Sequence, residues 1–562
     1  MRDGAALLAD MLTCFDVPVV TTVPGEGLFE VLDALAQRAP GVLLATFRHE
    51  AGAVFAAQAI GQLHDRPGVC LVARAPGALN TCLAVHTAYT DSAPLLLIVG
   101  QAATWYAQRE AFLGAQHLQQ VFAPLAKWVA EIPSAAHIPE FLGRAWHMAM
   151  SGRRGPVVLI LPEDVAAQCT AAAAYLPLPR VARAAPAAQD LAAFDAAIAS
   201  AERPMMIVGG TGWTAAALHA LQDCCAARRL PLATSYRRRD LVDHTHPLFC
   251  GEVGLGVDPA LAAQVADADL LVVLNARLGE INTVSASAFA GYTLLDAPVP
   301  QQRLLHVHPD AAELNAVYRA ELAIQSDPNA FVDAWAASAP PAAARHATRA
   351  ERDWLLRGPR ARTRFVTSGA CDGPLDLREV YAQLDASLQG EGLVTSGAGG
   401  YALWPQRYLR HRRPGTQLGP KSGAMGYGLS AAIGAALLAR HTHAPVSRPI
   451  VAIAGDGCFM MHAEELETAV RLRLDLVVLV INNRSYGTLG LTQQRRFGRT
   501  VGTALGEIDF AAFARSCGAR GETVSETAAF APALARALNA GTVSLIELRV
   551  PGSVVKPGPA RP

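Results

Sequence analysis

The chain contains 562 residues, of which 51% are hydrophobic and 17% are charged, and its formal net charge at pH 7 is zero. This length exceeds what one hydrophobic core can hold and predicts about three or four domains. A net charge of zero excludes a strong electrostatic attraction to nucleic acid or to an anionic membrane.

The search for targeting segments and the spacing of the cysteines further limit the classes of protein to which the chain can belong. No apolar run reaches the roughly 18 residues that a membrane-spanning helix needs. Asp3 and Asp10 lie in the amino-terminal segment, where a signal peptide would be uncharged, so we expect a cytoplasmic protein. The ten cysteines form no Cys-x-x-Cys pair and show no regular spacing, which predicts neither a disulfide framework nor a zinc site.

The first block, residues 1–168, alternates between strand-like and helix-like runs. Residues 49–64 have the spacing of a helix, and residues 74–80 (RAPGALN) are expected to form a loop that leads into another helix. Short apolar runs predict strands buried on both faces at 42–47, 67–73 and 94–100. The block therefore predicts a doubly wound α/β domain with a mainly parallel sheet.

Composition indicates where the blocks join. Residues 170–190 and 337–373 are rich in Ala, Pro and Arg without apolar periodicity, as linkers are. The middle block, 188–340, contains strand-to-loop units at 203–212, 268–280 and 303–315. The middle and third blocks, 188–340 and 366–550, also predict doubly wound domains, and no short repeat relates the three blocks.

The third block carries the most informative pattern of the chain. Residues 448–454 and 475–481 predict buried strands and 461–474 a helix, which together make one βαβ unit. Asp456 follows the first strand and Asn483 follows the second. Because parallel neighbouring strands lie about 4.8 Å apart, residues just past their carboxyl ends share one crevice. A carboxylate and an amide there suit Mg²⁺ that keeps phosphate oxygens in its shell.

This layout resembles the signature of thiamine diphosphate enzymes. The resemblance implies that Asp456, Asn483 and the backbone carbonyl of Ser485 bind the metal; Ca²⁺ is the alternative, and the small ligand count favours Mg²⁺. It also implies that the backbone around Gly455, Gly457 and Cys458 meets the diphosphate. A thiolate at Cys458, stabilised by a helix amino terminus, is the competing interpretation.

The segment before the metal motif is similar to other parts of the same cofactor site. Gly399, Gly400 and Tyr401 match the position where backbone N–H groups meet the diphosphate, although the family has an amide or His in place of Tyr401. In the stretch 422–426, Met425 matches the side chain that bends the cofactor. The carbonyl of Gly423 would accept a hydrogen bond from the cofactor's amino group.

The first block resembles the pyrimidine-binding domain of the acetolactate synthase branch. The motifs that carry this resemblance are Arg48-His49-Glu50, residues 75–80 (APGALN) and residues 89–94 (YTDSAP); Ala75 and Leu79 depart from the family pattern. The resemblance implies that Glu50 is catalytic, because its carboxyl would hydrogen-bond the pyrimidine ring and promote loss of the cofactor's C2 proton.

Further contacts with the cofactor follow from the same resemblance. Pro76 and Asn80 would line the pyrimidine site, and Gly25 would approach the thiazolium ring. Since Glu50 lies on the first block and the metal motif on the third, the cofactor must cross a domain interface. In this family the interface is between two subunits, which implies a homodimer at least, and a tetramer is expected.

The middle block resembles the domain that holds FAD in acetolactate synthases. Arg277 matches an Arg that contacts FAD. Yet His306 and His308 stand in the region where those enzymes have an acidic residue, and Glu252-Val253 replaces a Met-His pair. FAD binding therefore stays open, and the two histidines are expected to pack or face water rather than bind metal.

The reaction is predicted from the pocket residues. Ala73 stands where decarboxylases carry proton-donating histidines, which favours carboligation, and Phe112-Leu113 replaces the Phe-Gln of the family's acceptor pocket. We predict a thiamine diphosphate- and Mg²⁺-dependent carboligase or lyase that decarboxylates a 2-keto acid and transfers the acyl unit to a carbonyl acceptor. The alternatives are a benzoylformate- or indolepyruvate-type decarboxylase, a flavin-dependent oxidase and a non-catalytic cofactor-binding subunit; retention of Glu50 argues against the last.

Overall fold

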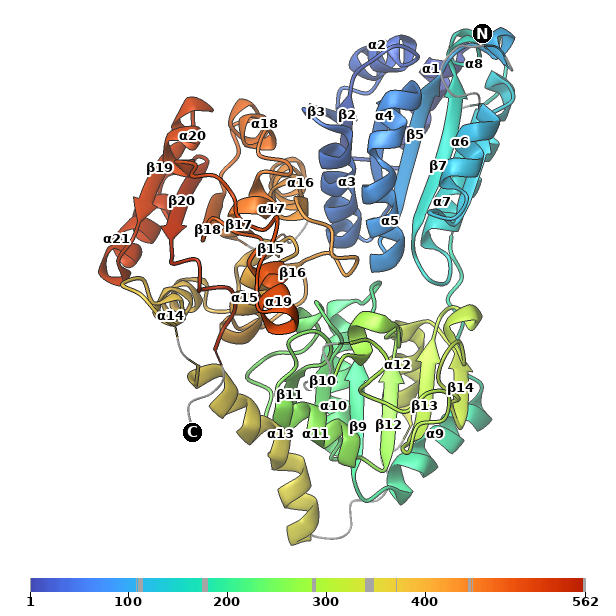
Figure 1. Ribbon diagram of the computed structural model, residues 1–562. Helices are drawn as coiled ribbons and strands as arrows, with labels where there is room; N and C mark the ends of the chain where they lie inside the picture. Colours follow the sequence, from blue (N-terminus) through green and yellow to red (C-terminus); the bar gives the residue numbers. More distant parts are fainter. Residues whose placement is uncertain are drawn as a thin grey trace.

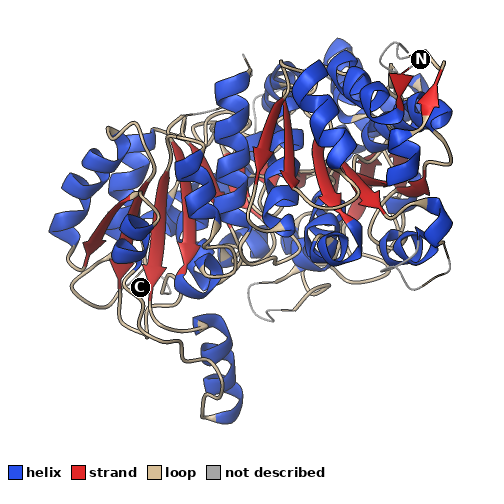
Figure 2. Ribbon diagram, turned by 90° about the horizontal axis from the view of Figure 1, so that it is seen from above, coloured by secondary structure: helices blue, strands red, loops and turns tan. Residues whose placement is uncertain are grey.

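Three α/β domains follow one another along the chain, each with a six-stranded sheet between helices (Figures 1 and 2). Within the three sheets all neighbouring strands run parallel, as predicted. The computed structural model describes residues 2–107, 109, 115–173, 180–285, 290–338, 348–369, 371–442, 446 and 448–558.

The first domain contains the strand order β3-β2-β4-β5-β7-β6. Its strands are β2 (Val19–Val23), β3 (Leu43–Thr46), β4 (Gly68–Ala73), β5 (Leu95–Gln101), β6 (Trp128–Glu131) and β7 (Pro156–Pro162), with a small antiparallel pair β1 (Arg2–Asp3) and β8 (Cys169–Thr170). Its helices are α1 (Gly4–Cys14), α2 (Phe29–Arg38), α3 (Glu50–His64), α4 (Arg74–Asn80), α5 (Cys82–Asp91), α6 (Ala115–Phe122), α7 (Ile138–Met150) and α8 (Glu163–Ala167).

Residues 74–80 form the helix α4, so the prediction of a loop there is wrong. Pro76 lies in the first turn, where a missing N–H removes no intrahelical hydrogen bond. Ala75 and Ala78 are three residues apart and both are buried, which gives this short helix one face toward the core.

The middle domain has the strand order β11-β10-β9-β12-β13-β14. Its strands are β9 (Pro204–Val208), β10 (Leu232–Thr234), β11 (Phe249–Glu252), β12 (Leu270–Leu274), β13 (Arg303–His308) and β14 (Leu322–Gln325). Its helices are α9 (Ala188–Ser200), α10 (Ala215–Ala227), α11 (Pro259–Asp267) and α12 (Pro328–Ala337).

The second predicted linker contains a regular helix, α13 (Arg349–Thr367), which corrects the reading of that stretch as irregular. Thr348 and Glu351 form a capping box at its start, and its buried residues Trp354, Gly358 and Ala361 follow helical spacing. The indole N–H of Trp354 donates to the Pro204 carbonyl (2.9 Å). This narrow apolar stripe packs the helix against the middle domain.

The third domain has the strand order β16-β15-β17-β18-β20-β19. Its strands are β15 (Leu393–Ser396), β16 (Gln417–Leu418), β17 (Ile450–Gly455), β18 (Val477–Asn482), β19 (Arg520–Val524) and β20 (Ser544–Arg549). Its helices are α14 (Leu377–Leu388), α15 (Leu403–Tyr408), α16 (Tyr427–His441), α17 (Asp456–Phe459), α18 (Glu465–Arg471), α19 (Gly487–Phe497), α20 (Phe510–Ser516) and α21 (Thr527–Leu538).

The predicted βαβ unit is confirmed, with a shorter helix than expected. β17 and β18 are parallel neighbours in which Gly455 lies opposite Ile481. The crossover contains α17 and α18 in place of one helix over 461–474. The strand register therefore brings the ends of the two motifs to the same edge of the sheet.

The order of the strands relates the first domain to the third, although no repeat in the sequence does. Numbered by position in the chain, the strands of the first and third sheets both run second-first-third-fourth-sixth-fifth, whereas the middle sheet runs third-second-first-fourth-fifth-sixth. In such sheets ligands bind at the carboxyl edge where neighbouring crossovers diverge. For the first and third sheets this point lies between the first and third strands.

The first and third domains pack through α3 and α16, which lie side by side (Figure 1). Both helices are rich in Ala and Gly and are buried around most of their circumference. A Cβ added to Gly434 would come within 2.3 Å of the Ala56 carbonyl oxygen, so the backbones approach closely only because Gly434 has no side chain. Phe55 and Tyr427 stack edge to face at 5.4 Å across this contact. One core thus spans the two domains.

Across the described residues, every helix is too short or too polar to cross a membrane.

Candidate active site

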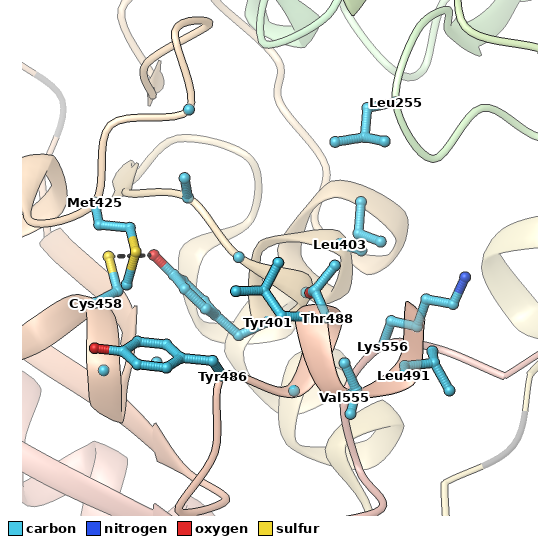
Figure 3. A pocket seen from close by; sticks show the side chains of 18 of the residues that line it. Leu255, Tyr401, Leu403, Met425, Cys458, Tyr486, Thr488, Leu491, Val555 and Lys556 are labelled. Atoms are coloured by element: carbon cyan, nitrogen blue, oxygen red, sulfur yellow. Dashed lines mark hydrogen bonds between the residues drawn. The ribbon is translucent and has the colours of Figure 1, made fainter. Parts of the chain in front are cut away.

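A cavity of about 630 Å³ opens at the carboxyl edge of the third sheet (Figure 3). The loop after β15 and the residues after β17 and β18 converge there, at the point where the crossovers diverge. All of the third-domain residues predicted to contact cofactor or metal line this cavity: Gly399, Gly400, Tyr401, Gly423, Met425, Gly455, Asp456, Gly457, Cys458, Asn483 and Ser485.

Asp456 is the only carboxylate among the described residues that line this cavity. It is 5% exposed, and its Oδ2 is buried without a hydrogen-bond partner. Burial raises the pKa of this carboxyl, while the backbone N–H groups of Gly457, Arg484 and Ser485 oppose that rise. A buried oxygen without a partner is costly, and a bound cation would compensate it.

The two adjacent asparagines have different surroundings. Asn482 Nδ2 donates to the buried Glu547 Oε1 (2.7 Å), and Asn482 does not line the cavity. Asn483 Nδ2 donates to the Val554 carbonyl (3.1 Å), and its Oδ1 accepts from the Ser485 N–H (3.2 Å). These bonds orient the Asn483 amide on the cavity wall, where one lone pair of Oδ1 is left for a metal.

Two tyrosines explain why glycine is needed on both sides of Asp456, in the predicted metal loop Gly455-Asp456-Gly457. A Cβ on Gly457 would lie 2.6 Å from Cε1 of Tyr486, and one on Gly455 would lie 2.7 Å from Cδ1 of Tyr401. Both distances are shorter than side chains tolerate, so the two rings approach the backbone only because the side chains are absent.

Tyr401 and Cys458 form a buried polar pair (Figure 3). The Tyr401 hydroxyl donates to Cys458 Sγ (3.0 Å), and the Gly426 N–H also donates to this sulfur (3.2 Å). Burial raises the pKa of the Cys458 thiol and raises the pKa of Tyr401. The thiol is therefore neutral at pH 7, which disfavours the thiolate interpretation.

Met425 and Gly423 also line the cavity. The Met425 side chain lies beside Cys458 (Figure 3) and is packed against the third-domain core. Gly423 has φ = +77° with open space where a Cβ would be, so glycine there meets a backbone requirement rather than a contact. Their assigned roles in bending the cofactor stay predictions.

Glu50 belongs to a second cluster, at the carboxyl edge of the first sheet. It begins α3, and its Oε2 accepts from Asn80 Nδ2 (2.9 Å). A Cβ on Gly77 would lie 3.0 Å from Glu50 Oε1, so the missing side chain at this position of α4 allows the close approach. Gly25 packs against the Ala73 side chain nearby, and Pro76 is exposed.

The two clusters are separate within one chain. Among the described residues that line the third-domain cavity, none comes from the group Gly25, Glu50, Pro76 and Asn80. That one cofactor joins the two clusters across two copies of the chain stays a prediction.

Sequence reasoning missed Glu465, which joins the two domains next to Glu50. Its fully buried carboxylate accepts from the backbone N–H groups of His49 (2.9 Å) and Arg48 (3.3 Å), and from Thr468 Oγ1 (2.7 Å). Burial raises its pKa to about 7. In the sequence Glu465 is one of several polar residues in a predicted helix. Its role in the contact between the two domains is visible only in the structure, where it meets His49, 416 residues earlier in the chain.

Comparison with known proteins agrees with this geometry. Three family models match: the N-terminal TPP binding domain of thiamine pyrophosphate enzymes at residues 2–123, their central domain at 191–335, and their C-terminal TPP binding domain at 397–548.

The chain belongs to the thiamine pyrophosphate enzymes.

Its relatives include acetolactate synthases over nearly their full length. The chain is 29% identical to the acetolactate synthase isozyme 2 large subunit of Escherichia coli K12, covering 99% of this chain and 98% of that protein. It is 29% identical to the isozyme 1 large subunit of the same organism (97% and 94%) and 27% identical to acetolactate synthase of Bacillus subtilis 168 (97% and 93%).

The cavity of this thiamine pyrophosphate enzyme fits a metal-bound diphosphate. Two buried oxygens lack partners there, Asp456 Oδ2 and Thr488 Oγ1, and the loop at Gly399-Gly400 presents backbone. The described residues hold no group of three or more His, Cys, Asp or Glu side chains that would bind a metal. A metal here would therefore use Asp456, Asn483 and phosphate oxygens, as Mg²⁺ does.

A second cavity, of about 290 Å³, lies where the crossovers of the middle sheet diverge. Gly210, Arg277 and His308 line it from the ends of three strands, and Lys421 lines both cavities. Arg277 Nε forms an ion pair with Glu313 (2.7 Å). Burial lowers the pKa of Lys421 to about 7 and that of His308 to about 3.

The middle-domain histidines pack inside the domain, as predicted. His306 and His308 are both buried, and a ring nitrogen of His306 lies 3.0 Å from the Ala276 carbonyl oxygen. Glu252 is also buried; it accepts from the Arg237 N–H and lies beside Arg239. The predicted substrate residues Phe112 and Leu113 fall outside the described residues.

Proposed function

We propose that this enzyme is a Mg²⁺-dependent carboligase or lyase of the acetolactate synthase type, which decarboxylates a 2-keto acid and transfers the acyl unit to a carbonyl acceptor. One observation carries the proposal: Asp456 and Asn483 line one cavity from the ends of adjacent strands, while a separate domain presents Glu50 held by Asn80. The acetolactate synthase relatives, matched over nearly the whole chain, support the reaction type.

The residues divide the work of the reaction. When bound, the cofactor would supply a nucleophile for the keto carbon and a sink for the electrons of decarboxylation. Asp456, Asn483 and the Ser485 carbonyl would hold Mg²⁺ against the diphosphate. Glu50 would hold a proton against the pyrimidine nitrogen, in a position that Asn80 and the Glu465 contact maintain.

The site is proposed to be completed by a second copy of the chain. Large apolar side chains are exposed beside both clusters: Leu79 (43%) and Leu83 (48%) near Glu50, and Met460 (44%) and Met461 (45%) after the metal loop. Such exposure marks surfaces that another protein covers. A homodimer that buries these faces would bring Glu50 of one subunit to the cavity of the other, and a tetramer is the expected larger assembly.

We propose that catalysis proceeds without flavin, because the middle domain does not fit FAD. Sites that enclose drug-sized ligands have volumes of about 300–1,000 Å³. The middle-domain cavity is about 290 Å³, and FAD exceeds drug size. Glu252, at the end of β11, is buried in a charged group with Arg237 and Arg239 and does not line this cavity.

A panel of 2-keto acids tests the proposed reaction. Purified protein with thiamine diphosphate and Mg²⁺ should release CO₂ and form a new carbon–carbon bond, detected as a 2-hydroxy-keto product. Ala73 offers no proton donor at the end of β4, so aldehyde should be the minor product. Aldehyde as the sole product would identify a decarboxylase, and no CO₂ from any keto acid would refute the proposal.

A further inference from the structure

The cavity extends well beyond the metal loop, along α19 and the carboxyl-terminal segment. α19 begins at Gly487, beside Asn483, and its last turn carries Arg495 and Arg496, which also line the cavity. At 1.5 Å per residue, Arg496 lies about 12 Å along the helix axis from Thr488. With the cofactor's diphosphate proposed at the metal end, the part of the cavity that extends along α19 to Arg496 is the part a substrate could occupy.

The wall between the two ends is apolar. Leu491 and Val555 face the same space, and Leu255 and Leu403 lie across from them (Figure 3). Val555 is held close, because a Cβ on Gly487 would come within 2.7 Å of its Cγ2. This wall suits a hydrocarbon chain and offers few polar partners to a small, fully hydrophilic substrate.

The far end of the cavity is positively charged. Lys556 lies beside Leu491 (Figure 3), and its pKa is lowered by burial and by the neighbouring Arg495. The sole carboxylate among the described lining residues, Asp456, is at the opposite end with the proposed metal. Arg237 and Lys421 also line the cavity: Arg237 donates to the Ser396 and Gly397 carbonyls, and Lys421 lines the middle-domain cavity as well.

We infer that the donor is a 2-keto acid with a second anionic group at the far end of its carbon chain, which Arg495, Arg496 and Lys556 bind. This inference rests on the proposed function and specifies its substrate class. Arginine forks bind carboxylate and phosphate alike, so the chemistry recognised is a distal anion on an apolar chain. A simpler role exists for the same cations, since the carboxyl end of a helix favours positive charge.

The experiment compares donors of equal chain length that end in carboxylate, phosphate or methyl, using the holoenzyme. The wild type should prefer an anionic end by about tenfold or more in kcat/KM, the factor that one charge-assisted hydrogen bond supplies. In R495Q/R496Q the ratio of anionic to methyl-ended donors should fall by about the same factor. Arg499→Gln is the matched control, because Arg499 is exposed, as Arg495 and Arg496 are, but is not among the cavity-lining residues.

A binding measurement separates this inference from the proposed reaction. Calorimetric titration with an unreactive saturated dicarboxylate should show about tenfold weaker binding to R495Q/R496Q than to Arg499→Gln. If no keto acid releases CO₂, the proposed function fails and this titration alone decides the inference. Equal preference for charged and methyl ends overturns the inference. So does a double variant that dissociates the dimer without changing the ratio, since the cations would then serve the subunit contact.

Discussion

Removing the Glu465 carboxylate tests how the third domain positions Glu50. In Glu465→Ala the backbone N–H groups of Arg48 and His49 lose their acceptor at a buried domain contact. Each buried donor left without a partner costs about 1–3 kcal/mol, so the variant should lose about 2–6 kcal/mol of stability. Because native proteins are stable by only about 5–15 kcal/mol, this loss should be large in a denaturant titration.

The matched control is Glu467→Ala, on the same helix. Glu467 also reaches the first domain, through an ion pair with Arg48 (2.7 Å), but both side chains are partly exposed. Such surface pairs contribute about 0–1 kcal/mol. Urea or guanidinium midpoints of the two variants, compared with wild type, measure the difference directly.

Turnover provides the second readout. A displacement of about 1 Å at a catalytic group can cost about a hundredfold in rate, so Glu465→Ala should lower kcat by about that factor. Glu465→Gln keeps an oxygen acceptor and should restore most of it. Equal stability and turnover in Glu465→Ala and Glu467→Ala would refute the reasoning.

Three further outcomes are expected. Because the pKa of Glu465 is raised to about 7, its contribution to stability is complete below pH 4.5 and is lost as pH rises to 7. The unfolding free energy of the wild type minus that of Glu465→Gln should therefore fall by about 3 kcal/mol over this range. Parallel plots of unfolding free energy against pH for the two proteins would contradict this. Glu50→Gln should keep cofactor affinity within about tenfold and slow turnover by about 100-fold or more; near wild-type turnover would refute its role. Gly457→Ala should cost about 1–3 kcal/mol and weaken cofactor binding, because its Cβ would meet Tyr486; unchanged titrations would show that the ring yields.

The local sequence pattern was enough to predict how Asp456 and Asn483 come together. The β-branched runs ending at Gly455 and Asn482 predicted parallel neighbours, and the observed register, with Gly455 opposite Ile481, brings Asp456 and Asn483 to one cavity. This worked because a buried parallel strand needs a continuous apolar run and a crossover has a fixed hand.

Local pattern failed where tertiary contact decides the structure. The sequence predicts a loop over residues 74–80, yet burial of Ala75 and Ala78 stabilises the helix α4. Only three of the 19 residues of α13 are buried, so its apolar periodicity could not be recognised among the many Arg and other polar residues of the segment. Glu465 could not be found at all, since its partners are 416 and 417 residues away.

The shared strand order of the outer domains was also invisible in the sequence. Many different apolar sequences can form the same buried parallel strand. Two domains can therefore share a strand order without a detectable sequence repeat. The same edge of each of the two sheets presents one half of the proposed site, Glu50 in the first domain and Asp456 in the third.

Mixing two inactive variants tests the central claim most directly. Glu50→Gln and Asp456→Ala are each expected to lack activity as homodimers. If each site combines Glu50 of one subunit with the metal loop of the other, random reassociation should restore about a quarter of wild-type activity, because half the dimers carry one intact site. No recovery from a mixture shown to exchange subunits would contradict the account and place both residues in one chain's site.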